Sequence, residues 1–439
     1  MDLDSREGGP SQPLPGTASF RERGPPARRD IQDPMLTFAY DIVCPYAYMA
    51  ATRVQALSAE RGVAVRWVPV LLGGLFRHHD APQVPASAWP ASKVALGAKD
   101  ILRSADLLGV PLRPHPGHPQ RTVEAMRLCV AAPDATRPAL SLALYEAYWV
   151  EGRDLTDRSV LAEVAGRFGL DLAVLDDPAV KQALFDTTAE VAGRGAFGVP
   201  TFFVGDQMWW GVDRLGFVEA ALGLAGAEAG PGPASTAAAG QAVRFFHDFA
   251  SPFSYLGATQ VARVAARHGA TVAWRPILLG ALFRSIGTPN VPLMAFSPAK
   301  QRHLLVDLRR WAEHREVEFN WPDCFPVRTV LPLRVALQAP EATAALYRAL
   351  WVEGRNIGEP AVVAEVLTDL GLDAAGLIEG ASDPAVKAQL FANTQLAETS
   401  GVCGVPTFQL EDGVVVWGQD RLALLDRLLT GWRPRPEAC

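Results

Sequence analysis

The sequence repeats itself, and the length of the repeat limits the fold more than any other feature. The stretch at 41–48 (DIVCPYAY) returns 207 residues later at 248–255 (DFASPFSY). This offset holds as far as Thr122 and Thr329, and a five-residue deletion in the second copy then shortens it to 202. Repeats of about 200 residues are whole domains rather than solenoid units. We therefore expect two tandem domains, called copy one and copy two below.

Each copy shows the same order of predicted elements. Copy one has strands at 36–40 and 64–70 around a helix at 45–61, and copy two has strands at 243–249 and 271–277 around a helix at 252–268. A long, mainly helical stretch follows, and Gly-Val-Pro then opens a strand pair (201–210; 407–417) before a last helix. A parallel β-α-β unit brings strand ends and a helix N-terminus together. The order predicts an α/β protein with two tandem thioredoxin-like domains, each with an inserted helical domain.

The segments around the two copies differ from them in composition. Residues 1–33 are rich in Pro, Gly, Arg and acidic residues, without the apolar core of a secretory signal. We expect a disordered extension there, domains at 34–222 and 242–432, and a tail at 433–439. Residues 223–241, rich in Ala, Gly and Pro, predict a flexible linker.

Charge and cysteine usage exclude several classes of protein. The net charge is −6, and no dense basic stretch argues for a nucleic-acid partner. No apolar run reaches the roughly 18 residues that a membrane span needs. The five cysteines contain no CxxC spacing, and an odd number in a chain of 439 residues does not suggest a disulfide framework. We expect a cytoplasmic protein that binds neither nucleic acid nor membrane and holds no metal.

The turn from strand to helix carries the chemistry. Cys44 and Ser251 occupy it, each followed by a proline that suits the first helical position. A helix N-terminus stabilises a thiolate, so we expect a lowered pKa for Cys44. A resolving thiol three residues on is missing, because Ala47 and Ser254 stand there. Ser251 either caps its helix or donates a hydrogen bond to the thiolate of another molecule.

Two prolines are candidates for cis peptide bonds. Pro200 and Pro406 each follow Gly-Val and precede a short strand. A cis bond would turn the backbone N–H and C=O of Val199 or Val405 outward, where they can pair with an extended, peptide-like ligand. An ordinary trans proline at the start of a strand is the alternative.

Copy two resembles the 2-hydroxychromene-2-carboxylate isomerases and kappa-class glutathione transferases, which are relatives of the DsbA-like thioredoxin fold. The resemblance extends from Val243 to about Leu429. The matching motifs are 248–255 (DFASPFSY), 274–283 (WRPILLGALF), 289–292 (PNVP), 298–300 (PAK), 404–408 (GVPTF) and 417–422 (WGQDRL). Each motif alone is weak, but six in order make the resemblance specific.

The resemblance implies a set of site residues. Ser251 would hydrogen-bond and activate the sulfur of glutathione, or of another low-molecular-weight thiol. Asn290 and Lys300 would line the pocket, and Val405, before Pro406, would pair with the cysteinyl backbone. The γ-glutamyl end would be held by Gln419, Asp420 and Arg421.

The reaction that the resemblance implies is a glutathione-dependent isomerisation in aromatic degradation. It interconverts 2-hydroxychromene-2-carboxylate and trans-o-hydroxybenzylidenepyruvate by addition and elimination of the thiolate. Lys300 or Arg328 would meet the carboxylate of this small aromatic substrate. Because single-copy relatives are commonly dimers, the resemblance also implies that the two copies form a pseudo-dimer within one chain.

Copy one departs from the family pattern and leaves alternatives open. Cys44 replaces the serine, Gln83 stands where Asn290 does, and Val212 stands where Gln419 does. Cys44 is either a second catalytic group or a relic. The alternatives to the isomerase are a thiol-disulfide oxidoreductase or glutathione transferase that uses Cys44, and a non-catalytic thiol-binding protein.

Overall fold

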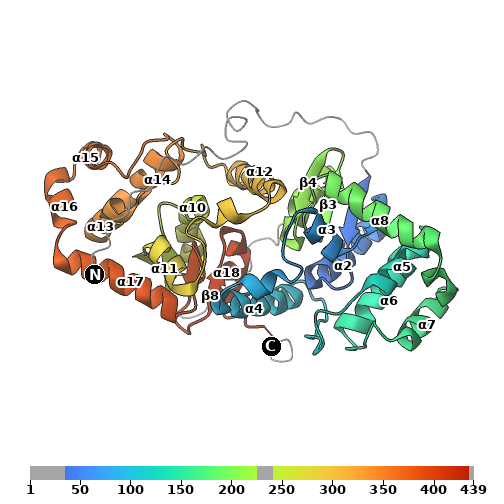
Figure 1. Cartoon of the computed structure of the whole chain (residues 1–439). Helices are drawn as coiled ribbons and strands as arrows, with labels where there is room; N and C mark the ends of the chain where they lie inside the picture. Colours follow the sequence, from blue (N-terminus) through green and yellow to red (C-terminus); the bar gives the residue numbers. More distant parts are fainter. Residues whose placement is uncertain (1–34, 225–240, 435–439) are drawn as a thin grey trace. The chain divides into compact units, whose positions relative to one another are not determined.

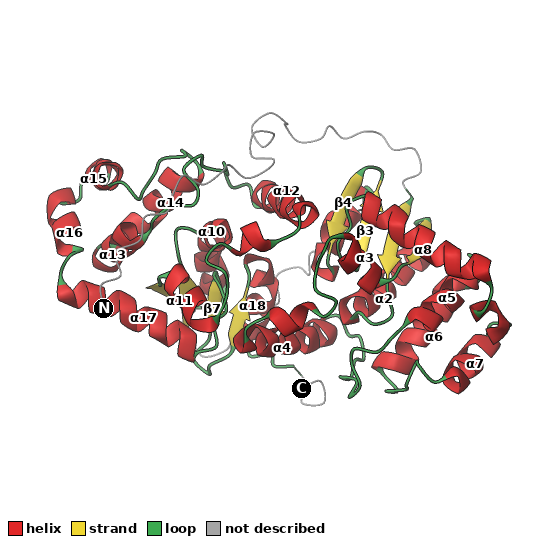
Figure 2. Cartoon of the chain, viewed as in Figure 1, coloured by secondary structure: helices red, strands yellow, loops and turns green. Residues whose placement is uncertain are grey.

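The computed structural model describes residues 35–224 and 241–434. These residues form two compact units, one from β1 to α9 and the other from β5 to η6. Strands lie among helices in each unit (Figures 1 and 2). The expected extension at 1–33, most of the linker at 223–241 and most of the tail at 433–439 lie outside the described residues. Within the described part, no helix combines the length and the apolar character that crossing a membrane requires.

The elements follow the predicted order in both copies. Copy one has the strands β1 (Leu36–Tyr40), β2 (Val65–Pro69), β3 (Thr201–Val204) and β4 (Gln207–Trp210). Its helices are α2 (Pro45–Arg61), α3 (Leu72–His78), η1 (Pro85–Ala88), α4 (Ala91–Leu107), α5 (Val123–Ala131), α6 (Arg137–Trp149), α7 (Arg158–Gly166), η2 (Leu172–Leu175), α8 (Pro178–Gly193), η3 (Val212–Arg214) and α9 (Leu215–Ala221).

Copy two has the strands β5 (Ala242–His247), β6 (Thr271–Pro276), β7 (Thr407–Gln409) and β8 (Val415–Trp417). Its helices are α10 (Pro252–Ala266), α11 (Leu279–Ile286), η4 (Pro292–Ala295), α12 (Pro298–His314), α13 (Val330–Gln338), η5 (Pro340–Ala342), α14 (Thr343–Trp351), α15 (Pro360–Asp369), α16 (Ala374–Gly380), α17 (Pro384–Thr399), η6 (Gln419–Arg421) and α18 (Leu422–Leu429).

Each copy contains one mixed four-stranded sheet. The strand orders are β2-β1-β3-β4 and β6-β5-β7-β8. The first two strands of each copy pair in parallel, with Phe38 opposite Trp67 and Phe245 opposite Trp274, and the remaining pairs are antiparallel. The predicted fold class, two α/β thioredoxin-like domains with helical insertions, is confirmed.

Aromatic side chains fill the same positions of both sheets. In copy two the Phe245 ring stacks on Phe408 with centroids 5.4 Å apart and meets Trp274 edge-on at 5.0 Å. Alternation along a strand places such residues on one face, and each aromatic pair adds about 0.5–1.5 kcal/mol beyond its buried area. The core against this face fixes the register of β5, and so fixes where the chain leaves the strand for the Ser251 turn.

Candidate functional site

Ser251 occupies the N-cap position of α10. Its Oγ accepts a hydrogen bond from the Ser254 N–H at 3.1 Å, and Pro252 follows at the first helical position. The side chain is buried, and the N-terminal dipole of a 15-residue helix is directed at it. Ser251 therefore caps α10 and also lies beside its N-terminal dipole.

The same hydroxyl contacts the second predicted feature of the site. Its Oγ donates to the Val405 carbonyl oxygen at 3.2 Å, and the Val405–Pro406 peptide bond is cis, as is Val199–Pro200 in copy one. Both cis bonds were predicted, and the structure adds two that were not, at Pro119 and Pro326. Among the described residues, the Val405 N–H donates to no acceptor.

Asp248 holds the turn in place from below. One carboxylate oxygen accepts from the Ala250 N–H at 3.0 Å and from the Thr329 hydroxyl at 2.7 Å, and the other accepts from the Leu279 N–H at 2.9 Å. Burial raises the pKa of Asp248, and the three hydrogen bonds act against that shift. The Trp351 indole also donates to the Phe249 carbonyl at 2.8 Å. Asp248 thus ties the turn to α11 and to the start of α13, as expected for a structural residue.

The loop after β8 joins the same region. The Gly418 N–H donates to the Pro406 carbonyl at 3.0 Å, and η6 packs against α10. Asp420 and Arg421 lie 3.6 Å apart as an ion pair, both largely buried. Gln419 is also buried, and Arg315, the C-cap residue of α12, donates to both its side-chain and its backbone oxygen. Gln419 therefore fixes the loop through Arg315.

The remaining predicted residues come from other elements. Asn290 lies against the first turn of α11, because a Cβ added at Gly280 would sit 2.7 Å from the Asn290 Oδ1. The Lys300 ammonium lies 4.0 Å from the centre of the Phe296 ring. Arg328 is exposed and directly precedes Thr329. The structure thus brings Ser251, Val405 and Pro406 into contact and ties the η6 loop to them, while Asn290, Lys300 and Arg328 lie on separate elements.

The Cys44 thiol is not ionised as readily as its position at a helix N-terminus suggested. It is the N-cap residue of α2, and its Sγ donates to the Val199 carbonyl at 3.2 Å. Burial raises the pKa of Cys44 to about 12, and the backbone N–H groups of Tyr46 and Ala47 offset only part of the shift. The expectation of a lowered pKa is wrong, because the loss of hydration outweighs the helix N-terminus.

Two residues of the site region were missed from the sequence, Thr329 and Arg315. Thr329 binds Asp248, and its counterpart Thr122 binds Asp41 at 2.7 Å in the same way. Arg315 could have been found by comparing the copies. Arg315 and Gln419 of copy two are both apolar in copy one, where Leu108 and Val212 stand. A paired change of this kind indicates contact.

The donors and acceptors present suit a thiol-containing peptide. The Ser251 hydroxyl offers a donor to sulfur, the Val405 N–H offers one to a backbone carbonyl, and Asp420 offers a carboxylate for an ammonium. Cys324 and Cys403, the cysteines of copy two that the structure describes, are free thiols, and neither lies in the Ser251 turn. The sulfur would thus come from the ligand.

Comparison with known proteins identifies the domain family. The family model of the DSBA-like thioredoxin domain matches residues 35–223 and again residues 242–430. A 2-hydroxychromene-2-carboxylate isomerase of Sphingobium xenophagum is 30% identical over 191 residues, which is 43% of this chain and 97% of that relative. Glutathione S-transferase kappa 1 of Homo sapiens is 28% identical over 206 residues, covering 43% and 90%. A solved structure of 2-hydroxychromene-2-carboxylate isomerase aligns with a TM-score of 0.39 at 26% identity, covering 43% of this chain and 94% of that one.

Proposed function

The chain belongs to the DSBA-like thioredoxin domain family and contains two copies of that domain. We propose that copy two is a glutathione-dependent isomerase of the 2-hydroxychromene-2-carboxylate type. The observation that carries the proposal is the Ser251 hydroxyl, buried at a helix N-terminus and bonded to the carbonyl before a cis-proline. The named activity of the Sphingobium relative supports the choice of reaction.

Ser251 is the residue that would hold the sulfur in its ionised form. Its hydroxyl has a single proton, which it gives to the Val405 carbonyl over 3.2 Å, a long distance for an O–H···O bond. Turning that proton toward a thiolate exchanges a weak neutral hydrogen bond for a stronger charge-assisted one. The N-terminus of α10 adds a favourable partial charge. Glutathione, when bound, supplies the nucleophilic sulfur that the chain itself lacks at this turn.

The other predicted residues would bind and orient. The Val405 N–H would pair with the cysteinyl carbonyl of the ligand, and Asp420 would meet its ammonium, with Gln419 and Arg421 keeping the η6 loop in place. Asn290, in the loop after α11, would line the pocket beside the first turn of that helix. Lys300 and Arg328 would meet the carboxylate of the aromatic substrate.

Disulfide exchange through Cys44 is the weaker candidate. A thiol with a pKa near 12 has little thiolate at neutral pH, and position 47 offers no resolving cysteine. The structure favours neither a transferase nor an oxidoreductase that depends on copy one.

The test measures the interconversion of 2-hydroxychromene-2-carboxylate and trans-o-hydroxybenzylidenepyruvate by absorbance, in the presence of glutathione. Ser251→Ala removes a hydrogen bond to a charged group, so we expect kcat/KM to fall about 10- to 100-fold. Thr259→Ala, which removes another hydroxyl from α10 that bonds only within the helix, is the matched control. Activity that survives Ser251→Ala but is lost with Cys44→Ser would overturn the proposal, as would a failure of the full chain to bind glutathione by calorimetry.

A further inference from the structure

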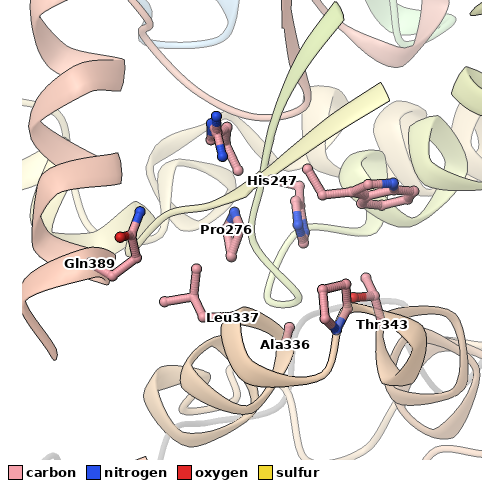
Figure 3. Close-up of a pocket in the computed structure, with 9 residues that line it drawn as sticks. His247, Pro276, Ala336, Leu337, Thr343 and Gln389 are labelled. Atoms are coloured by element: carbon pink, nitrogen blue, oxygen red, sulfur yellow. The ribbon is translucent and has the colours of Figure 1, made fainter. Parts of the chain in front are cut away.

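Copy two contains a pocket of about 270 Å³ at the β6 edge of its sheet (Figure 3). Its walls include His247 of β5, Trp274 of β6, Ala336 and Leu337 at the end of α13, and Thr343 at the start of α14. None of the residues that line it belongs to the Ser251 site.

An arginine lies at the corresponding position in copy one. The Arg137 side chain is 16% exposed, and its Nε and Nη2 donate to the carbonyls of Cys129 and Ala132, each at 2.8 Å. Longer bonds reach the carbonyls of Val130 at 3.4 Å and Trp67 at 3.5 Å. The last turn of α5 and the edge strand β2 thus form a cradle of carbonyl oxygens around one guanidinium.

The five-residue deletion removes this arginine from copy two, while Ala336 and Leu337, the counterparts of Cys129 and Val130, line the pocket. The offset of 207 pairs Cys129 with Ala336 and continues to Pro133 and Pro340, whereas Ser141 pairs with Thr343 at an offset of 202. The residues missing from copy two correspond to 136–140, which include Arg137.

The neighbouring side chains also became smaller or less buried. Tyr40, whose hydroxyl bonds to Ser141 at 2.6 Å in copy one, is replaced by His247, and Cys129 is replaced by Ala336. Trp67 is 4% exposed, while its counterpart Trp274 is only partly buried.

His247 points an unused nitrogen at the pocket. The residue is fully buried, and its Nε2 has no hydrogen-bond partner among the described residues. The His247 Nδ1 and the Tyr347 hydroxyl form a hydrogen bond at 3.0 Å, and the same hydroxyl lies 3.4 Å from the Asp248 carbonyl oxygen. Burial lowers the pKa of His247 to about 3, which keeps the ring neutral. In the tautomer with the proton on Nδ1, Nε2 is an acceptor, and Figure 3 shows the ring and Ala336 among the lining residues.

Copy two has also kept an acidic residue beside the pocket. Arg137 pairs with Asp134 in copy one, and the counterpart of Asp134 is Glu341, next to Pro340 in the pocket wall. Within the described ranges, Glu341 has no cationic partner. The wall also includes Arg275, whose side chain leaves β6 on the face opposite Trp274. The pocket therefore offers carbonyl acceptors on the side where copy one places its arginine, while the exposed Glu341 lies outside the lining.

We propose that this pocket binds the guanidinium or amidinium group of a small molecule, in the place that Arg137 takes in copy one. A planar, N–H-rich cation matches the carbonyl oxygens at the end of α13, and the His247 Nε2 in the pocket wall accepts from it when the ring proton is on Nδ1. The cation and its recognition are independent of the thiol site.

The test uses the full chain without thiol and measures binding of methylguanidinium by calorimetry at millimolar concentration. Methylammonium, a compact cation, and urea, a neutral planar donor, are the matched ligands at equal ionic strength. We expect saturable binding of methylguanidinium at one site per chain and at least tenfold weaker binding of the other two. Hydrogen exchange should slow in the peptide that spans 330–343.

Two variants decide where the ligand binds. Inserting residues 136–140 of copy one (TRPAL) after Ala342 gives copy two its own arginine, and binding should weaken at least tenfold, whereas the same insertion with alanine in place of arginine should retain it. Arg137→Ala should create a second site, with two ligands bound per chain. No saturable binding by the unmodified chain, equal binding of urea, or binding unaffected by the arginine-containing insertion would overturn the proposal.

Discussion

Cys44 and Ser251 occupy equivalent N-cap positions, yet burial affects them differently. A hydroxyl stays neutral in a buried turn, so Ser251 loses nothing there and can donate to a charge that a ligand brings. A thiol must ionise before it can act as a nucleophile, and the 8% exposed Cys44 ionises only against the cost of desolvation. The same turn therefore suits a serine that assists another molecule's sulfur better than a cysteine that provides its own.

We predict that Cys44 alkylates slowly and with a steep pH dependence. A pKa raised to about 12 leaves roughly a thousandfold less thiolate at pH 8 than an ordinary thiol has. The alkylation rate with iodoacetamide, followed by peptide mapping, should rise about tenfold per pH unit from pH 7 to 10 without a plateau. The half-exposed Cys324 is the internal control and should react faster. A plateau below pH 8 for Cys44 would contradict the raised pKa.

At the scale of elements, Arg315 at the C-terminal end of α12 joins the helical insertion to the η6 loop, which follows β8. Its guanidinium stacks 4.6 Å from the centre of the Trp311 ring and donates to both oxygens of Gln419. Copy one lacks both partners, having Leu108 and Val212 instead. The pair is therefore a local feature of copy two that fixes the loop carrying Asp420.

We predict that Arg315 and Gln419 are energetically coupled. Arg315→Leu leaves the buried Gln419 side chain without its donor, which costs about 1–3 kcal/mol, and Gln419→Val removes one of the two bonds that Arg315 makes to residue 419. The double variant restores the combination of copy one and should cost less than the sum, with a coupling energy of about 1 kcal/mol. Hydrogen exchange of the peptide spanning 415–421 measures the local stability, and Arg315→Lys separates charge from fork geometry. Additive effects would contradict the coupling.

Sequence reasoning recovered whole elements better than their contacts. The helix at 45–61 ends where the structure ends α2, because Gly62 takes the left-handed conformation there. The strand pair expected at 407–417 is confirmed, with β7 ending at Gln409 and β8 beginning at Val415. The Ser251 contact with Val405 joins residues 154 positions apart, and no local pattern reports such a distance. The pKa of Cys44 depends on burial that only the packed domain defines.

At the scale of the whole molecule, the duplication itself carries the last prediction. The alignment with the Sphingobium isomerase uses 43% of this chain and covers 97% of that relative, so this chain is about twice as long as the relative. If the two copies take the two positions of a symmetric dimer, both halves of the isologous interface are already used within one chain. We therefore predict a solution mass of one chain, about 47.2 kDa, by light scattering after size exclusion. This mass should stay constant from micromolar to tenfold higher concentration, because an internal interface does not depend on concentration. A mass of two chains would contradict the pseudo-dimer and would mean that each copy still pairs with a copy from another chain.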